Sequence, residues 1–244
     1  MTRDARRAYR VVDDFEAELC SYTGAPHAVA VSSCTNALLL ALTWRRLNGG
    51  GIAGAQVAGD EIRAVLPPRT YVGVLQSVLN AGYTPYFVNR FAGWQERGFY
   101  SMTMPPVVCD SARMICQGRY VQADDLVCLS FHAAKQLPLG RGGAILTDNE
   151  EAADWFRAAR MDGRPPGEPI EATVFPGFHC PMPPDVAARG LDILSRWNDR
   201  GYSPPPLPHE DYPDLSLIYP PGRNLSGQQT ERLESWPARE GVAP

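Results

Sequence analysis

Lys135 is the residue whose type and position point most directly to chemistry. It follows the apolar run 126–130, and it is the single lysine among the 23 lysine and arginine residues of the sequence. A lysine just past a strand can point into the crevice above a sheet, where loss of water favours the neutral amine that imine chemistry needs. Arginine cannot supply that amine at neutral pH. We therefore interpret Lys135 as a Schiff-base lysine; a solvated loop lysine is the alternative.

Asp110 is a second candidate, because it ends the apolar run 106–109. A carboxylate in this position could hold the proton on the pyridine nitrogen of pyridoxal 5'-phosphate (PLP) and keep the ring an electron sink. It could equally cap a short turn, since Ser111 and Ala112 follow it. From the residue alone, both interpretations stay open.

A polar turn provides a candidate anion site. Ser33, Cys34 and Thr35 follow a short apolar run and open a helical pattern, so free backbone N–H groups and hydroxyls could surround a phosphate there. Ser130 could add a hydroxyl, and Tyr71 could stack on a flat ring. The alternatives are an ordinary helix cap and ordinary core packing. Together with the lysine and the aspartate, this set predicts a PLP site.

Alternating strands and helices must position these side chains. Apolar periodicity predicts helices over 11–22, 36–46, 71–81, 150–162 and 185–198, and strands over 27–31, 62–66, 86–88, 106–109, 126–130 and 143–147. Such alternation predicts an α/β fold with a mainly parallel mixed sheet and helices on both faces. Ligands of such sheets bind at the carboxyl ends of the strands. The candidate polar residues all follow predicted strands.

Composition narrows the function classes. The net charge is -4, and the sequence shows no stripe of basic residues of the kind that binds nucleic acid. We therefore expect small-molecule partners. No pair among the six cysteines has metal-binding or redox spacing, and we expect reduced thiols in a cytoplasmic protein without a metal. We expect neither a signal peptide nor a membrane span. Residues 1–200 are expected to form one domain, and 201–244 a proline-rich tail that wraps a neighbour or is partly disordered.

Several stretches, taken in order, resemble the DegT/DnrJ/EryC1/StrS family of PLP-dependent sugar aminotransferases. The matching stretches are Phe15-Glu16, Tyr22-Thr23-Gly24, Ala28–Leu38, Gly59-Asp60-Glu61, Leu66–Tyr71, Ala81–Val88, Asp110-Ser111-Ala112, Ser130–Gly143 and Gly177-Phe178-His179. They cover roughly residues 12–198, and the loop around Lys135 is the most specific of them. The resemblance implies the type I (aspartate aminotransferase-like) large domain. It also implies a homodimer with active sites at its interface.

The resemblance also implies roles for individual residues. Lys135 would be the Schiff-base lysine, Asp110 the partner of the pyridine nitrogen, and Tyr71 a neighbour of the ring. Three further residues would hold the phosphate: Cys34, Thr35 and Ser130. Where this sequence has Arg113 the family has glutamine beside the cofactor oxygen, and where it has His179 the family has an asparagine donated by the partner subunit.

Two further departures concern the backbone and the C-terminus. Cys34 replaces a family glycine, which would strain the turn if that position needs a positive φ. Family members continue into a C-terminal small domain, and this sequence has the proline-rich tail there.

The expected function is an aminotransferase that moves an amino group from an amino-acid donor to a keto group on a nucleotide-linked sugar. Lys135 would also shuttle the proton between substrate and cofactor. Two alternatives remain open. One is a PLP enzyme with another reaction, such as decarboxylation or elimination. The other is a non-catalytic PLP-fold subunit with a binding or regulatory role.

Overall fold

The computed structural model describes residues 3–48, 62–91, 93–103, 107–118, 120 and 125–219. Its helices are α1 (Arg3–Thr23), α2 (Cys34–Asn48), α3 (Val72–Asn80), α4 (Trp94–Arg97), α5 (Glu150–Ala159), α6 (Pro184–Asp199) and α7 (Leu215–Ile218). Its strands are β1 (His27–Val31), β2 (Arg63–Leu66), β3 (Thr84–Phe87), β4 (Tyr100–Ser101), β5 (Val108–Ser111), β6 (Leu126–Ser130) and β7 (Gly143–Thr147). Two short 3₁₀ turns lie at Asn89–Phe91 and Ile170–Ala172.

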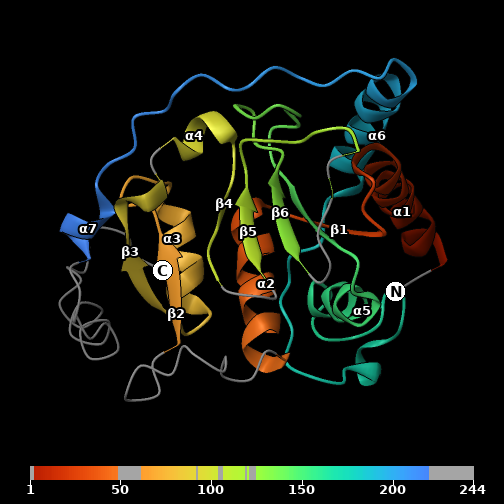
Figure 1. Cartoon of the computed structure of the whole chain (residues 1–244). Helices are drawn as coiled ribbons and strands as arrows, with labels where there is room; N and C mark the ends of the chain where they lie inside the picture. Colours follow the sequence, from red (N-terminus) through yellow and green to blue (C-terminus); the bar gives the residue numbers. More distant parts are fainter. Residues whose placement is uncertain are drawn as a thin grey trace, which may run out of the picture.

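Helices cover both faces of the main sheet (Figure 1). Side chains alternate along β1, so Val29 and Val31 join the core with α2, α3 and α5, whereas Ala28 and Ala30 join the core with α1 and α6. β7 alternates in the same way. This period of two is the reason that strands buried on both faces have continuous apolar sequences. The predicted layering is confirmed.

The sheet is mixed, and less parallel than the sequence pattern predicted. Its order is β1-β7-β6-β5-β4; only β5 and β6 pair in parallel, while β7 runs antiparallel to both β1 and β6, and β4 runs antiparallel to β5. A separate parallel pair joins β2 and β3. β7 follows β6 through the loop 131–142 without a crossover helix, so it returns in the opposite direction. β1, β5 and β6 still point the same way, and their carboxyl ends meet at one edge.

Most predicted elements are present, with shifts at their ends. The strands over 27–31, 126–130 and 143–147 match β1, β6 and β7. α1 begins at Arg3, eight residues before its expected start. No helix or strand was predicted over 91–103, which contains α4 and β4. None of the helices in the described part of the chain is long and apolar enough to cross a membrane.

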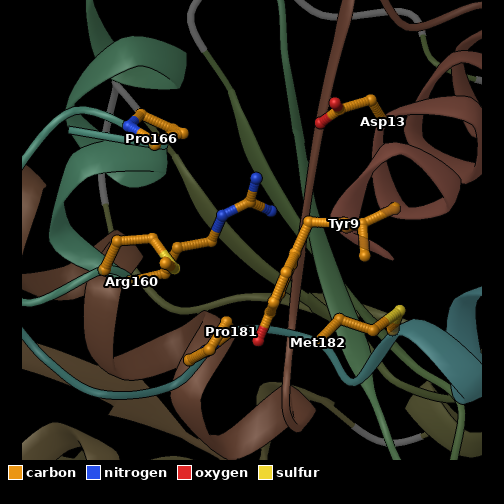
Figure 2. Close-up of a pocket in the computed structure, with 9 residues that line it drawn as sticks. Tyr9, Asp13, Arg160, Pro166, Pro181 and Met182 are labelled. Atoms are coloured by element: carbon orange, nitrogen blue, oxygen red, sulfur yellow. The ribbon is translucent and has the colours of Figure 1, made fainter. Parts of the chain in front are cut away.

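A buried ion pair closes the open edge of the sheet at β1. The Ala30 N–H donates to Glu16 Oε1 at 2.8 Å, and Arg160 Nη1 donates to the Ala30 carbonyl at 2.6 Å as well as to Glu16. Figure 2 shows Arg160 lining a small pocket with Tyr9 and Asp13 of α1. The pair satisfies backbone groups that an edge strand would otherwise leave free. It thereby fixes the strand that leads into the turn at Ser33.

Residues 202–214, which we call the strap, run from α6 across the top of the sheet to α7 (Figure 1). Prolines 204, 205, 206, 208 and 213 have no N–H, so the strap is held mainly through its carbonyl groups. Gln136 donates to the Pro205 carbonyl at 2.7 Å, and Arg69 donates to the Tyr212 carbonyl at 3.0 Å. Residues 201–219 of the expected tail therefore lie against their own chain. Residues 220–244 lie outside the described residues.

Candidate active site

A cavity of about 300 Å³ lies at the carboxyl ends of β5 and β6, beside the start of α2. Its walls include most of the predicted site residues, namely Ser33, Cys34, Thr35, Tyr71, Asp110, Arg113, Ser130 and Lys135. They come together because the parallel strands β1, β5 and β6 all end at this edge, as the sequence pattern predicted.

Lys135 reaches this cavity from the loop between β6 and β7. Its N–H donates to the His132 carbonyl at 2.9 Å, which closes a turn. Its side chain is only 12% exposed, and Nζ lies 3.0 Å from Glu210 Oε1. The solvated-loop interpretation is therefore wrong for this conformation. The only lysine amine of the sequence therefore lies in the cavity and is largely shielded from solvent.

Asp110 is almost fully buried at the end of β5. Burial raises the pKa of its carboxyl group, and the Ala112 N–H, the Tyr100 hydroxyl and the Lys135 charge offset only part of this effect. The Ala112 N–H donates to Asp110 Oδ1 at 2.9 Å, so the residue also caps a turn. The turn-cap interpretation is confirmed, whereas the pairing with a cofactor nitrogen stays a prediction. A raised carboxyl pKa in a cavity fits a site that receives a cationic partner.

The turn before α2 presents an N-terminus to the cavity. Ser33 Oγ accepts from the Asn36 N–H at 3.1 Å, and Cys34 is the first helical residue. A side chain at Gly143 would place its Cβ 2.5 Å from the Cys34 backbone nitrogen, so only glycine lets β7 pack against this turn. The remaining N–H groups of the first helical turn could bind an anion.

Cys34 does not strain this turn. Among the described non-glycine residues only Asp162 has a positive φ, so Cys34 occupies a conformation that any residue adopts. Burial, with a further contribution from Asp110, raises the pKa of the Cys34 thiol well above its usual value. The thiol is therefore neutral and acts as a packing group. None of the six cysteines, all of which lie in the described ranges, forms a disulfide.

Tyr71 and Ser130 both line the cavity. Tyr71 directly precedes α3 and is 57% exposed, so its ring is available at the mouth of the cavity. A Cβ at Gly73 would lie 2.6 Å from the Tyr71 ring and 2.9 Å from Thr35 Oγ1. The absence of a side chain at Gly73 thus lets the Tyr71 ring and the Thr35 hydroxyl approach each other.

Sequence reasoning missed the residues that close the cavity, Trp94, Glu210 and Tyr212. Arg113 Nη1 pairs with Glu210 Oε1, the same oxygen that contacts Lys135, and the Tyr212 hydroxyl donates to Glu210 Oε2. Burial alone would raise the pKa of Glu210, but these hydrogen bonds and the two positive charges outweigh it and lower the pKa. A glutamate in a proline-rich stretch carries no sequence signal for such a position.

His179 lies outside the cavity. Its Nδ1 is 3.1 Å from Asp162 Oδ1, and its side chain is 77% exposed. The expectation that it reaches the cofactor of a partner subunit stays a prediction. No group of His, Cys, Asp and Glu side chains in the described ranges could hold a metal ion.

The cavity fits PLP in its donor groups. It combines an amine, a buried carboxylate with a raised pKa and a helix N-terminus with hydroxyls. These match the aldehyde, ring nitrogen and phosphate of that cofactor. The arrangement is suited to chemistry in which a carbonyl group condenses with an amine.

Known proteins resemble this chain in sequence. The family model of the DegT/DnrJ/EryC1/StrS aminotransferase family matches residues 2–91 and 106–200. The spore coat polysaccharide biosynthesis protein SpsC of Bacillus subtilis is 29% identical over 233 residues, a match that covers 77% of this chain and 57% of SpsC. The chain thus spans little more than half the length of this relative.

Solved structures share the fold. NtdA of Bacillus subtilis, whose structure contains the cofactor PMP, matches with a TM-score of 0.61 and 19% identity over 77% of this chain and 48% of its own. PseC of Helicobacter pylori, an aminotransferase of pseudoaminic acid biosynthesis, matches with a TM-score of 0.57 and 18% identity over 82% and 64%. The predicted type I fold is thereby confirmed. Because the family model matches most of the chain, the chain belongs to the DegT/DnrJ/EryC1/StrS aminotransferase family.

Proposed function

We propose that this chain is a PLP-dependent aminotransferase that moves an amino group from an amino-acid donor to a keto group on a nucleotide-linked sugar. One observation carries the proposal: the single lysine of the sequence lies in the same cavity as the buried Asp110 and the N-terminus of α2. A purely structural role would not require a buried carboxylate with a raised pKa next to a sequestered amine.

Each residue has a role that follows from its position. The Lys135 amine holds the cofactor and moves a proton on and off the substrate carbon. Asp110 would hold the proton of the ring nitrogen, and Tyr71 would contact the ring. The α2 N-terminus, with Thr35, Ser33 and Ser130, binds the phosphate. When bound, PLP supplies the electron sink that transamination requires.

The proposal also includes a sugar acceptor, a homodimeric assembly and a cytoplasmic location. SpsC and PseC, by their names, act in polysaccharide and pseudoaminic acid biosynthesis, which supports a sugar acceptor. The His179 side chain contacts Asp162 but is 77% exposed, so a second subunit could approach it, which supports a homodimer with shared sites. None of the six cysteines, all of which the structure describes, is in a disulfide, which supports a cytoplasmic enzyme.

Borohydride reduction followed by mass spectrometry tests the cofactor assignment. We expect a pyridoxyl mass on the peptide that contains Lys135, and none in Lys135→Arg. That variant is a matched control because it keeps the positive charge beside Glu210 but cannot condense with an aldehyde. An adduct that persists elsewhere in Lys135→Arg would refute the role of Lys135.

A second measurement separates catalysis from binding alone. With glutamate as donor, we expect release of a keto acid together with a spectral change of the bound cofactor. An adduct on Lys135 without keto acid from any donor would favour the non-catalytic subunit. Release of carbon dioxide or ammonia would favour another PLP reaction.

A further inference from the structure

The guanidinium of Arg113 takes its hydrogen-bond partners from the strap. Nη1 pairs with Glu210 Oε1, and Nη2 donates to the carbonyls of Leu207, at 3.3 Å, and Pro208. Nε is buried and has no partner. The whole residue is only 2% exposed. Arg113 is therefore a buried cation with spare donor capacity, and its ion-pair partner belongs to a different part of the chain.

The strap is anchored so that Glu210 points into the cavity. The Gln95 side chain forms two hydrogen bonds of 2.8 Å with the Glu210 backbone, one to its N–H and one to its carbonyl. Beyond it, the Tyr212 ring stacks on Trp94 at 6.1 Å, and Leu215 is fully buried. These contacts hold the Glu210 carboxylate at the mouth, one-third exposed, where the buried cations face it.

A carboxylate in this place is adjacent to the reacting amine. A single oxygen of Glu210 contacts both Arg113 and Lys135, at 3.0 Å from Lys135 Nζ. The amino donor of an aminotransferase carries its carboxylate on the carbon that bears the amine. A donor whose carboxylate replaced that of Glu210 would thus place its amine beside Lys135.

Replacement of the Glu210 carboxylate by a donor carboxylate is coupled to opening of the strap, because Arg113 is a buried cation. If the strap left without replacement, Arg113 would lose its counter-ion and its carbonyl acceptors, and an unpaired buried charge is strongly destabilising. An entering carboxylate can satisfy the guanidinium with two parallel hydrogen bonds. Opening is therefore favoured when a carboxylate takes the place of Glu210.

We propose that Arg113 binds the carboxylate of the amino donor and that Glu210 occupies this position until the donor displaces it. This assignment rests on the proposed aminotransferase function. It makes Arg113 a specificity-determining residue and the strap the element that a donor must move.

Glutarate binding to the full-length, PLP-loaded protein tests the assignment, because glutarate has the carboxylates of a donor but no amine. Affinity is measured by calorimetry, and strap opening by hydrogen exchange of the segment 207–219. We expect glutarate to increase exchange in this segment. Glu210→Gln should bind glutarate about tenfold more tightly, if the strap of the parent protein is open in roughly one molecule in ten. Arg113→Gln should bind it about 30-fold more weakly or worse.

Asp211→Asn is the matched control. It removes a carboxylate from the neighbouring strap position, where the side chain is 96% exposed and meets only Arg69 at 3.7 Å. It should bind glutarate as the parent protein does. Inorganic phosphate is the anion control and should leave the segment protected.

Three results would overturn the proposal: equal glutarate affinity in Glu210→Gln and the parent, unchanged affinity in Arg113→Gln, or strap opening by phosphate as readily as by glutarate. Circular dichroism and the borohydride adduct on Lys135 show whether Arg113→Gln is folded. Absence of that adduct in every form would refute the PLP assignment instead. The glutarate measurements on cofactor-free protein would still decide whether Arg113 binds carboxylates.

Discussion

The ion pair between Glu16 and Arg160 offers a sharp test of how the edge of the sheet is held. The pair is nearly fully buried, with side-chain exposures of 9% for Glu16 and 6% for Arg160. The perturbation is Glu16→Ala, which leaves Arg160 as a buried charge without a carboxylate. It also leaves the Ala30 N–H without its acceptor.

The expected cost has two parts. Breaking a buried ion pair by removal of one partner costs about 3–5 kcal/mol. Loss of the hydrogen bond to the Ala30 N–H adds about 1 kcal/mol. We expect Glu16→Ala to lower the free energy of unfolding by about 4–6 kcal/mol. Glu16→Gln keeps an oxygen for Ala30, so it should cost about 1.5–3 kcal/mol, the contribution of a hydrogen bond to a charged group.

Urea denaturation of the cofactor-free protein measures these differences, with the slope checked to be equal among variants. The control is Asp192→Asn, because Asp192 pairs with Arg196 on the exposed face of α6 at 2.6 Å. An exposed pair contributes about 0–1 kcal/mol. If Glu16→Ala costs no more than this control, the edge of β1 is held by other contacts and the argument fails.

The remaining predictions concern the site. Asp110→Asn can still accept from the Ala112 N–H but relieves the cost of a buried charge, so the cofactor-free variant should melt no lower than the parent. Its PLP affinity should fall by roughly 10–100-fold, measured by equilibrium titration, through loss of a charge-assisted hydrogen bond; an unchanged PLP affinity would show that Asp110 acts only as a turn cap. The pKa of Glu210 is lowered from its usual 4.5, so its contribution to strap closure is complete above that pH and is lost as the pH falls through the lowered value. The amide resonance of Glu210 should report this release in the parent protein and no such transition in Glu210→Gln; a transition of the same midpoint in both would exclude Glu210 as the titrating group.

The sequence was sufficient to predict the residues of the inner cavity. Lys135 and the turn at Ser33 follow apolar strands, Asp110 lies near the end of β5, and strands pointing the same way end at one edge. The positions of these residues in space follow from local periodicity and a general rule of α/β sheets.

The direction of β7 was harder to predict from the sequence. Alternation of strands and helices favours parallel pairing, but no helix separates β6 from β7. The loop that carries Lys135 connects them directly, so the return is antiparallel. Attention to the missing crossover would have predicted this reversal.

The residues of the outer wall of the site are positioned by contacts between distant parts of the sequence. Glu210 meets Arg113 across 97 positions of sequence, and its backbone meets Gln95 across 115. A proline-rich segment has little periodicity of its own, since its backbone forms few internal hydrogen bonds. Its path is set by the side chains that donate to its carbonyls.

The sequence by itself determined the chemistry that the inner site can perform, because the identity of an amine, a carboxylate and a helix start is local information. Only the tertiary structure decided which residues form the outer wall of the cavity, Glu210 of the strap among them. The reason is physical: a carboxylate on an extended strap gains its place from two cations buried elsewhere in the fold, and no pattern in its own neighbourhood encodes them.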